Sequence, residues 1–150
     1  MSELKTRINE AVKTAMRAGD KSRLGTLRLI TAALKQREVD ERKELTDDDV
    51  VATLAKMVKQ RRESIAQFQQ AGRDDLADRE LAEIAVISDF LPQPLTDAEI
   101  DRLIAQAIAE TGAVGIRDMG KVMAALKPQI QGRADPAAIS SRVKQRLSAQ

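Results

Sequence analysis

The sequence contains no histidine, cysteine, tryptophan or tyrosine, and its only aromatic residues are Phe68 and Phe90. Without histidine and cysteine there is no Ser-His-Asp triad, no cysteine nucleophile and no Cys/His zinc or iron–sulfur site. Carboxylates alone could still bind Mg²⁺ or Ca²⁺. Two phenylalanines are too few for a surface that stacks several bases. These absences remove whole classes of chemistry and name no function.

Long hydrophobic runs are also missing. No stretch approaches the roughly 18 apolar residues of a membrane span. The start, Met1-Ser2-Glu3-Leu4-Lys5, has an early acid and no apolar run, unlike a signal peptide. The lack of cysteine fits a reducing compartment. We therefore expect a cytoplasmic protein without membrane association and without a cofactor.

The net charge of +2 conceals an uneven distribution along the chain. Residues 1–37 carry a net charge of +6, residues 38–111 carry −9 and residues 112–150 carry +5. Basic ends that fold close together could form a phosphate-facing surface. The alternative is that complementary charges hold the helices to one another, and charge alone does not decide between the two.

Apolar residues recur at helical intervals along nearly the whole chain, and no segment shows the alternation of a strand. The clearest break is Leu91-Pro92-Gln93-Pro94, because each proline disfavours helical conformation in the residue before it. The pattern predicts an all-α protein with four helices in residues 1–91 and three in residues 92–150. We expect these two segments to be separate helical subdomains.

Capping residues and glycines predict where the helices begin and end. The expected N-caps are Ser2, Thr46, Asp74 or Asp75, Thr96 (with Glu99 in a capping box) and Asp135, which precedes Pro136. The expected ends are Gly19, Gly72, Gly112 and Pro128.

Apolar stripes predict which side chains face the core. In the first helix the stripe is Leu4, Ile8, Val12 and Met16; in the fourth it includes Leu81. Ile116 is expected on the apolar face of the helix that ends at Pro128. Gly120 in that helix is interpreted as a small residue that lets a neighbouring helix approach.

Three short motifs that could carry chemistry are better explained structurally. Gly115-x-x-x-x-Gly120-Lys121 lacks the Ser/Thr and the preceding strand of a P-loop. Ser141-x-x-Lys144 lacks the companion motifs of serine acyl enzymes. Asp47-Asp48-Asp49 could hold a divalent cation, but consecutive helical residues point in different directions, so we interpret these acids as stabilising a helix start.

Basic residues are the more suggestive candidates. Within the acidic middle, Lys59 and Arg62 lie three residues apart and could bind a phosphate or an acidic partner together, although pairing with Glu63 or with acids of the next helix is at least as good an explanation. In the last third, Arg117 and Lys121 are four residues apart on the polar side of a helix, and Arg133 precedes a helix start, which favours an anion. The candidate tRNA- or phosphate-binding residues are Arg117, Lys121, Lys127, Arg133, Arg142 and Arg146.

Several motifs in order, covering almost the whole chain, resemble the GatB/YqeY family. In the first half they are Leu24-Gly25-Thr26-Leu27-Arg28-Leu29-Ile30, Lys59-Gln60-Arg61-Arg62-Glu63-Ser64-Ile65, Gln70-Ala71-Gly72-Arg73 and Asp75-Leu76-Ala77. In the second half they are Phe90-Leu91-Pro92, Ile108-Ala109-Glu110-Thr111-Gly112-Ala113, Asp118-Met119-Gly120-Lys121-Val122-Met123 and Gly132-Arg133-Ala134-Asp135.

The resemblance implies two helical subdomains, of which the second is similar to the tail domain of the B subunit of tRNA-dependent amidotransferase. That tail domain is implied to contact tRNA, whereas amide activation and glutamine hydrolysis belong to parts that are not visible in this sequence. We therefore expect a non-catalytic module that binds tRNA, or tRNA synthetase or amidotransferase components, through phosphate and shape contacts. The alternatives are an accessory or stand-alone amidotransferase activity with glutamine as amide donor, and a protein-interaction module. The sequence leaves the oligomeric state open.

Overall fold

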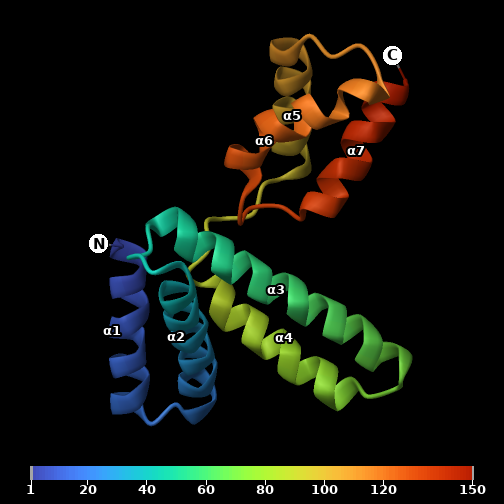
Figure 1. The fold of residues 1–150 in the computed structure, drawn as a ribbon. Coiled ribbons are helices and arrows are strands. Elements are labelled where there is room, and N and C mark those ends of the chain that lie inside the picture. Colours follow the sequence, from blue (N-terminus) through green and yellow to red (C-terminus); the bar gives the residue numbers. More distant parts are fainter. Residues whose placement is uncertain (1, 150) are drawn as a thin grey trace. The chain divides into compact units, whose positions relative to one another are not determined.

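The computed structural model describes residues 2–149, which form seven α-helices and one 3₁₀ turn and contain no strand (Figure 1). This confirms the predicted all-α class and the number of helices. The chain divides into two compact units, Met1–Leu91 (unit 1) and Pro92–Gln150 (unit 2). None of the helices described in either unit combines the length and the apolar character needed to cross a bilayer.

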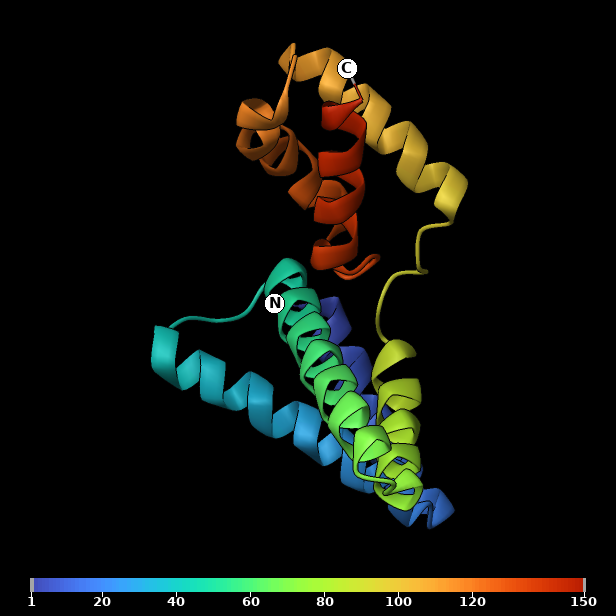
Figure 2. The ribbon, with the colours of Figure 1, turned by 90° about the vertical axis from the view of Figure 1, so that its right-hand side faces the viewer.

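Unit 1 consists of α1 (Glu3–Ala18), α2 (Lys21–Glu41), α3 (Asp47–Gln70) and α4 (Asp74–Ser88). Helices α3 and α4 form an antiparallel hairpin, and α1 and α2 pack beside each other and against it (Figures 1 and 2). The core of the unit draws large apolar residues from all four helices, among them Ile8, Leu27, Leu54 and Ile87.

The predicted caps explain both ends of α1 and the start of α3. The Ser2 hydroxyl accepts a hydrogen bond from Lys5 N at 3.0 Å, and Gly19 ends α1 with φ +69°. Thr46 and Asp49 form a reciprocal capping box at the start of α3. The prediction for α4 was wrong: its N-cap is Arg73, without a side-chain cap, and Asp74 already lies inside the helix, where its charge favours the first turn.

Two predicted core positions in unit 1 are exposed. Met16 is 55% exposed, and Ala15 is buried in its place. A strict four-residue repeat advances about 40° per step around a 3.6-residue helix, so the fourth member of the stripe has left the inner face. Leu81 is likewise 49% exposed, and Ala77 faces the core one turn earlier.

Unit 2 consists of α5 (Asp97–Thr111), the 3₁₀ turn η1 (Ile116–Asp118), α6 (Met119–Ile130) and α7 (Pro136–Ser148). The predicted Thr96–Glu99 capping box is present, Gly112 ends α5 with φ +66°, and Asp135 caps α7 by accepting from Ala137 N at 3.0 Å. The three helices enclose a second core.

Three expectations for α6 were wrong. The helix continues through Pro128 to Ile130, because a proline in the last turn removes a single backbone bond and Ile130 is buried in the core. Ile116 lies in η1 and is exposed. A Cβ on Gly120 would meet nothing within 4 Å, so no neighbouring helix requires glycine there.

Candidate nucleic-acid interface

Arg117 and Lys121 lie at the junction of η1 and α6, and both side chains face solvent. The Lys121 side chain is 70% exposed, and its Nζ is 3.9 Å from the Asp118 carboxylate. Arg117 makes no ion pair or hydrogen bond with any side chain among the described residues. The two cations therefore remain open to an external anion.

Asp118 is the only carboxylate within ion-pair distance of this pair among residues 2–149, and its main contacts are local. It accepts a hydrogen bond from Val114 N at 3.0 Å, and its side chain is 15% exposed. This backbone bond is the largest cause of the lowered pKa of Asp118, and the charges of Lys121 and Arg117 add to it. Asp118 thus fastens the loop that presents Arg117.

Arg146 and Lys127 are also exposed and have no ion-pair partner in the described part of the chain. Arg146 lies in the last turn of α7, and this helix packs against η1 (Figure 1). Lys127 lies in the last turn of α6, at the opposite end of that helix from Lys121. Arg146 is thus placed at the same end of unit 2 as Arg117, and Lys127 is not.

Arg133 and Arg142, predicted with the other cations, are occupied inside unit 2. Arg133 Nε donates to the Gln93 carbonyl at 2.9 Å, and its Nη2 is 4.0 Å from Glu99. Arg142 pairs with Asp97 at 3.3 Å and with Asp101. These guanidinium groups tie the start of α5 to the loop before α7 and to α7 itself.

The helix start after Arg133 is not arranged to receive an anion. The Asp135 carboxylate accepts the amide hydrogen of Ala137 and places a negative charge at the N-terminus of α7. A helix N-terminus attracts anions through its unpaired N–H groups and its dipole. Here the chain itself supplies that anion.

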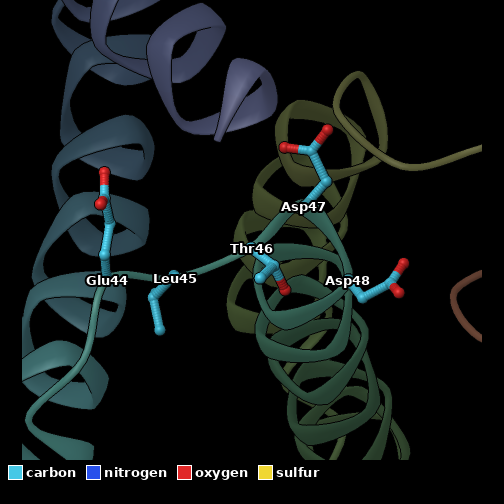
Figure 3. Close-up of a pocket in the computed structure, with 5 residues that line it drawn as sticks. All are labelled: Glu44, Leu45, Thr46, Asp47 and Asp48. Carbon is cyan, nitrogen blue, oxygen red and sulfur yellow. The ribbon is translucent and has the colours of Figure 1, made fainter. Parts of the chain in front are cut away.

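The acidic segment at the start of α3 has its own partners. It lines a pocket formed by Glu44, Leu45, Thr46, Asp47 and Asp48, in which the two aspartates point in different directions (Figure 3). Asp47 accepts hydrogen bonds from the Ser2 hydroxyl and from Leu4 N, and these bonds lower its pKa. Across the described residues, no three acidic groups are placed to hold a metal ion together.

The remaining motifs do not assemble a reactive site. Gly115 is extended and leads into η1, and no strand precedes it within residues 2–149, so the backbone is not that of a P-loop. Ser141 and Lys144 are both exposed, and neither side chain bonds to the other.

Sequence reasoning missed two features. Pairing with acids of the next helix was one of the alternatives for the basic cluster of α3, but the residue that pairs was not identified. It is Arg61, whose Nε lies 2.8 Å from Glu83 and 3.9 Å from Glu80 on α4, while Lys59 and Arg62 stay exposed. Beside Arg117, the apolar Val114 is 66% exposed. The exposure of Val114 could have been expected from Gly112 and Gly115, because these two glycines place it in a loop outside the neighbouring helices.

Comparison with known proteins gives a consistent family. Residues 5–147 match the family described as Yqey-like protein. Three fungal relatives named "Altered inheritance of mitochondria protein 41, mitochondrial" also match. That of Pyrenophora tritici-repentis is 30% identical over 146 residues, which is 95% of this chain and 80% of the relative. Those of Lachancea thermotolerans and Eremothecium gossypii are 33% and 35% identical over 69% and 61% of this chain.

The chain spans 57% and 51% of the length of the latter two relatives. The names of all three describe mitochondrial proteins, which contradicts the cytoplasmic location expected from the sequence. That expectation rested on absences, which carry little information about location. The family match covers almost all of the described residues in both units, and the chain therefore belongs to the YqeY-like protein family.

Proposed function

We propose that this protein is a non-catalytic tRNA-binding module whose contact surface is the η1 end of unit 2. The observation that carries the proposal is the exposed Arg117–Lys121 pair, whose one carboxylate neighbour among residues 2–149 is Asp118, 3.9 Å from Lys121 Nζ. Arg146 adds a third cation at the same end, and Lys127 a fourth further along α6. Besides tRNA, the proposed partners of this protein are tRNA synthetase or amidotransferase components.

The chemistry of this surface favours backbone recognition over base recognition. Arginine and lysine contact phosphates, and these contacts position a protein on RNA without reading its sequence. Neither Phe68 nor Phe90 lies in unit 2, so no aromatic ring of that unit stacks on a base. Val114 and Ile116 supply an exposed apolar edge beside the cations that can pack on sugar faces.

The test is binding of labelled bulk tRNA over a range of salt concentrations. In R117E/K121E we expect roughly tenfold weaker binding at low salt, because two phosphate contacts become repulsive. The dependence of log K on log salt should be shallower by about 1.5, since fewer counterions are released. Circular dichroism should show unchanged helix content.

The matched control is K59E/R62E, which makes the same change in net charge with two exposed residues of α3. This variant should keep the affinity and the salt dependence of the wild type. Equal losses in both variants would show attraction to net charge instead of a defined site, and an unchanged affinity of R117E/K121E would rule out the η1 surface.

A further inference from the structure

Helix α2 has apolar residues on two sides, and only one side belongs to the core of unit 1. Leu27, Ile30 and Leu34 are buried against the other helices. A second row recurs at alternating steps of three and four residues, and every member of it is exposed. This row, called the outer stripe, consists of the apolar or small residues Gly25, Leu29, Ala32 and Val39 together with the polar residues Ser22 and Gln36.

Alternating steps of three and four are the spacing of the a and d positions of a coiled coil. Leu29 and Val39 are 46% and 63% exposed, and both belong to this row. In Figure 2 α2 lies at the edge of unit 1, and Arg37 in its C-terminal half bonds to Asp49 and Thr53 at the start of α3. The stripe is therefore available to another helix.

Gly25 is a separate indication of close approach. It lies inside an α-helix, where glycine is less favourable than alanine, and a Cβ there would meet nothing within 4 Å. Nothing inside unit 1 thus explains a glycine at this position. With Ala32 two turns further on, it leaves the α2 backbone accessible to a partner.

Most charges along α2 divide between the two sides, the exception being Asp40, which accepts a hydrogen bond from Gln36 of the outer stripe. Four charged side chains of α2 form ion pairs within unit 1. Arg23 pairs with Asp89, Glu38 pairs with Lys5, and Arg37 pairs both with Glu41 of α2 and with Asp49 of α3. Lys21, Arg28 and Lys35 follow one another every seven residues beside the outer stripe and are exposed. Among the residues described, none of these three has an ion-pair partner.

We propose that the outer stripe of α2 binds an acidic amphipathic helix of a partner protein, packed along it as in a coiled coil. The partner would place apolar residues on Gly25, Leu29, Ala32 and Val39, and carboxylates opposite Lys21, Arg28 and Lys35. In coiled coils, charges that flank the apolar seam select the partner in this way. The proposal is independent of tRNA binding, because it concerns another unit.

Two other occupants fit less well. RNA would neutralise the three cations, but its phosphates offer no cover for Leu29 and Val39. A second copy of α2 packed antiparallel would bring the same three cations against one another, which is repulsive. A second copy packed in parallel would place Lys21 and Arg28 opposite Thr26 and Ala33, which offer them no carboxylate. An acidic helix satisfies both the apolar stripe and the charges.

The test uses a three-heptad helical peptide with leucine in its core positions, glutamate beside them and one tryptophan. Because the protein has no tryptophan or tyrosine, the fluorescence reports the peptide alone. Wild-type protein should bind this peptide at least about tenfold more tightly than a version with lysine in place of glutamate. R28E/K35E should reverse that preference.

The apolar part of the surface is tested by L29Q/V39Q, with M16Q/L81Q as the matched control on α1 and α4. We expect about tenfold weaker binding of the acidic peptide in the first variant and wild-type binding in the second. Equal binding of both peptides, or no effect of L29Q/V39Q, would overturn the proposal.

Two further outcomes would replace the proposed occupant. If R28E/K35E weakens tRNA binding and L29Q/V39Q changes neither tRNA nor peptide binding, the stripe is a nucleic-acid surface. If the wild type sediments as a dimer and L29Q/V39Q as a monomer, the occupant is a second copy of the chain. Circular dichroism of each variant should match the wild type.

Discussion

At the scale of single residues, the Asp49 carboxylate combines a capping hydrogen bond with two ion pairs. It accepts from Thr46 N at 3.0 Å, lies 3.1 Å from Arg37 Nη2 and 3.2 Å from Lys43 Nζ. The hydrogen bond from Thr46 is the first cause of its lowered pKa, which falls from 3.8 to about 2. The charged form of Asp49 is thus favoured in the folded state.

We predict that D49N removes part of the acid sensitivity of folding. A carboxyl whose pKa is lower in the folded chain contributes stability above its unfolded pKa of 3.8 and loses it as the pH falls through about 2. The difference in unfolding free energy between wild type and D49N should be largest near neutral pH and shrink towards pH 2. Urea unfolding across this range measures it.

The control is D48N, one residue along in the same first turn, where the side chain is exposed and makes no hydrogen bond within the described chain. Near neutral pH, D48N should lower the unfolding free energy by less than D49N, because it removes a charge that accepts no hydrogen bond. A pH-independent difference between D49N and the wild type would contradict the part assigned to Asp49.

The sequence shows where the cationic side chains of unit 2 are, but not which of them form ion pairs or hydrogen bonds. That depends on partners far along the chain. Arg142 pairs with acids more than 40 positions away, and Arg133 with a carbonyl 40 positions away. No local pattern encodes such pairs. That Arg117 has no ion-pair partner in the described chain agrees with its local sequence, because its neighbours within one turn are almost all apolar or small.

At the scale of elements, helix ends were easier to predict than helix faces. A cap such as Thr96 acts through atoms three residues away, so its effect is visible in the local sequence. The inner face of a helix depends on what packs against it, as Met16 and Ile116 show. The outer stripe of α2 is the extreme case, because its apolar residues look like core residues until the core is known.

Two glycines at the ends of the α5–α6 connection should respond oppositely to alanine. Gly112 has φ +66°, where a Cβ is strained, so G112A should lower the unfolding free energy by about 1 kcal/mol. Gly120 lies inside α6 with open space around it, so G120A should raise stability by about 0.5–1 kcal/mol.

Denaturant unfolding of both variants measures the two effects. A loss of stability in G120A would show that a neighbouring group approaches this position more closely than the structure places it. No loss in G112A would mean that the end of α5 relaxes without the left-handed residue.

At the scale of the whole molecule, each of the two units carries its own core. The residues of the first core all precede Pro92, and those of the second all follow Pro94. Two separate helical subdomains, as proposed from Leu91-Pro92-Gln93-Pro94, would then unfold independently.

We predict that a cavity in one core leaves the stability of the other unit unchanged. Leu27 and Ile104 are fully buried in the first and second cores, and alanine at either position should cost about 2–5 kcal/mol within its own unit. Hydrogen exchange of the full chain measures the stability of both units in one experiment, because the protection of each amide reports the local unfolding free energy. L27A should lose protection in α1–α4 only, and I104A in α5–α7 only. Loss of protection throughout the chain in either variant would show one cooperative domain, and the tRNA surface of unit 2 could then not be treated apart from unit 1.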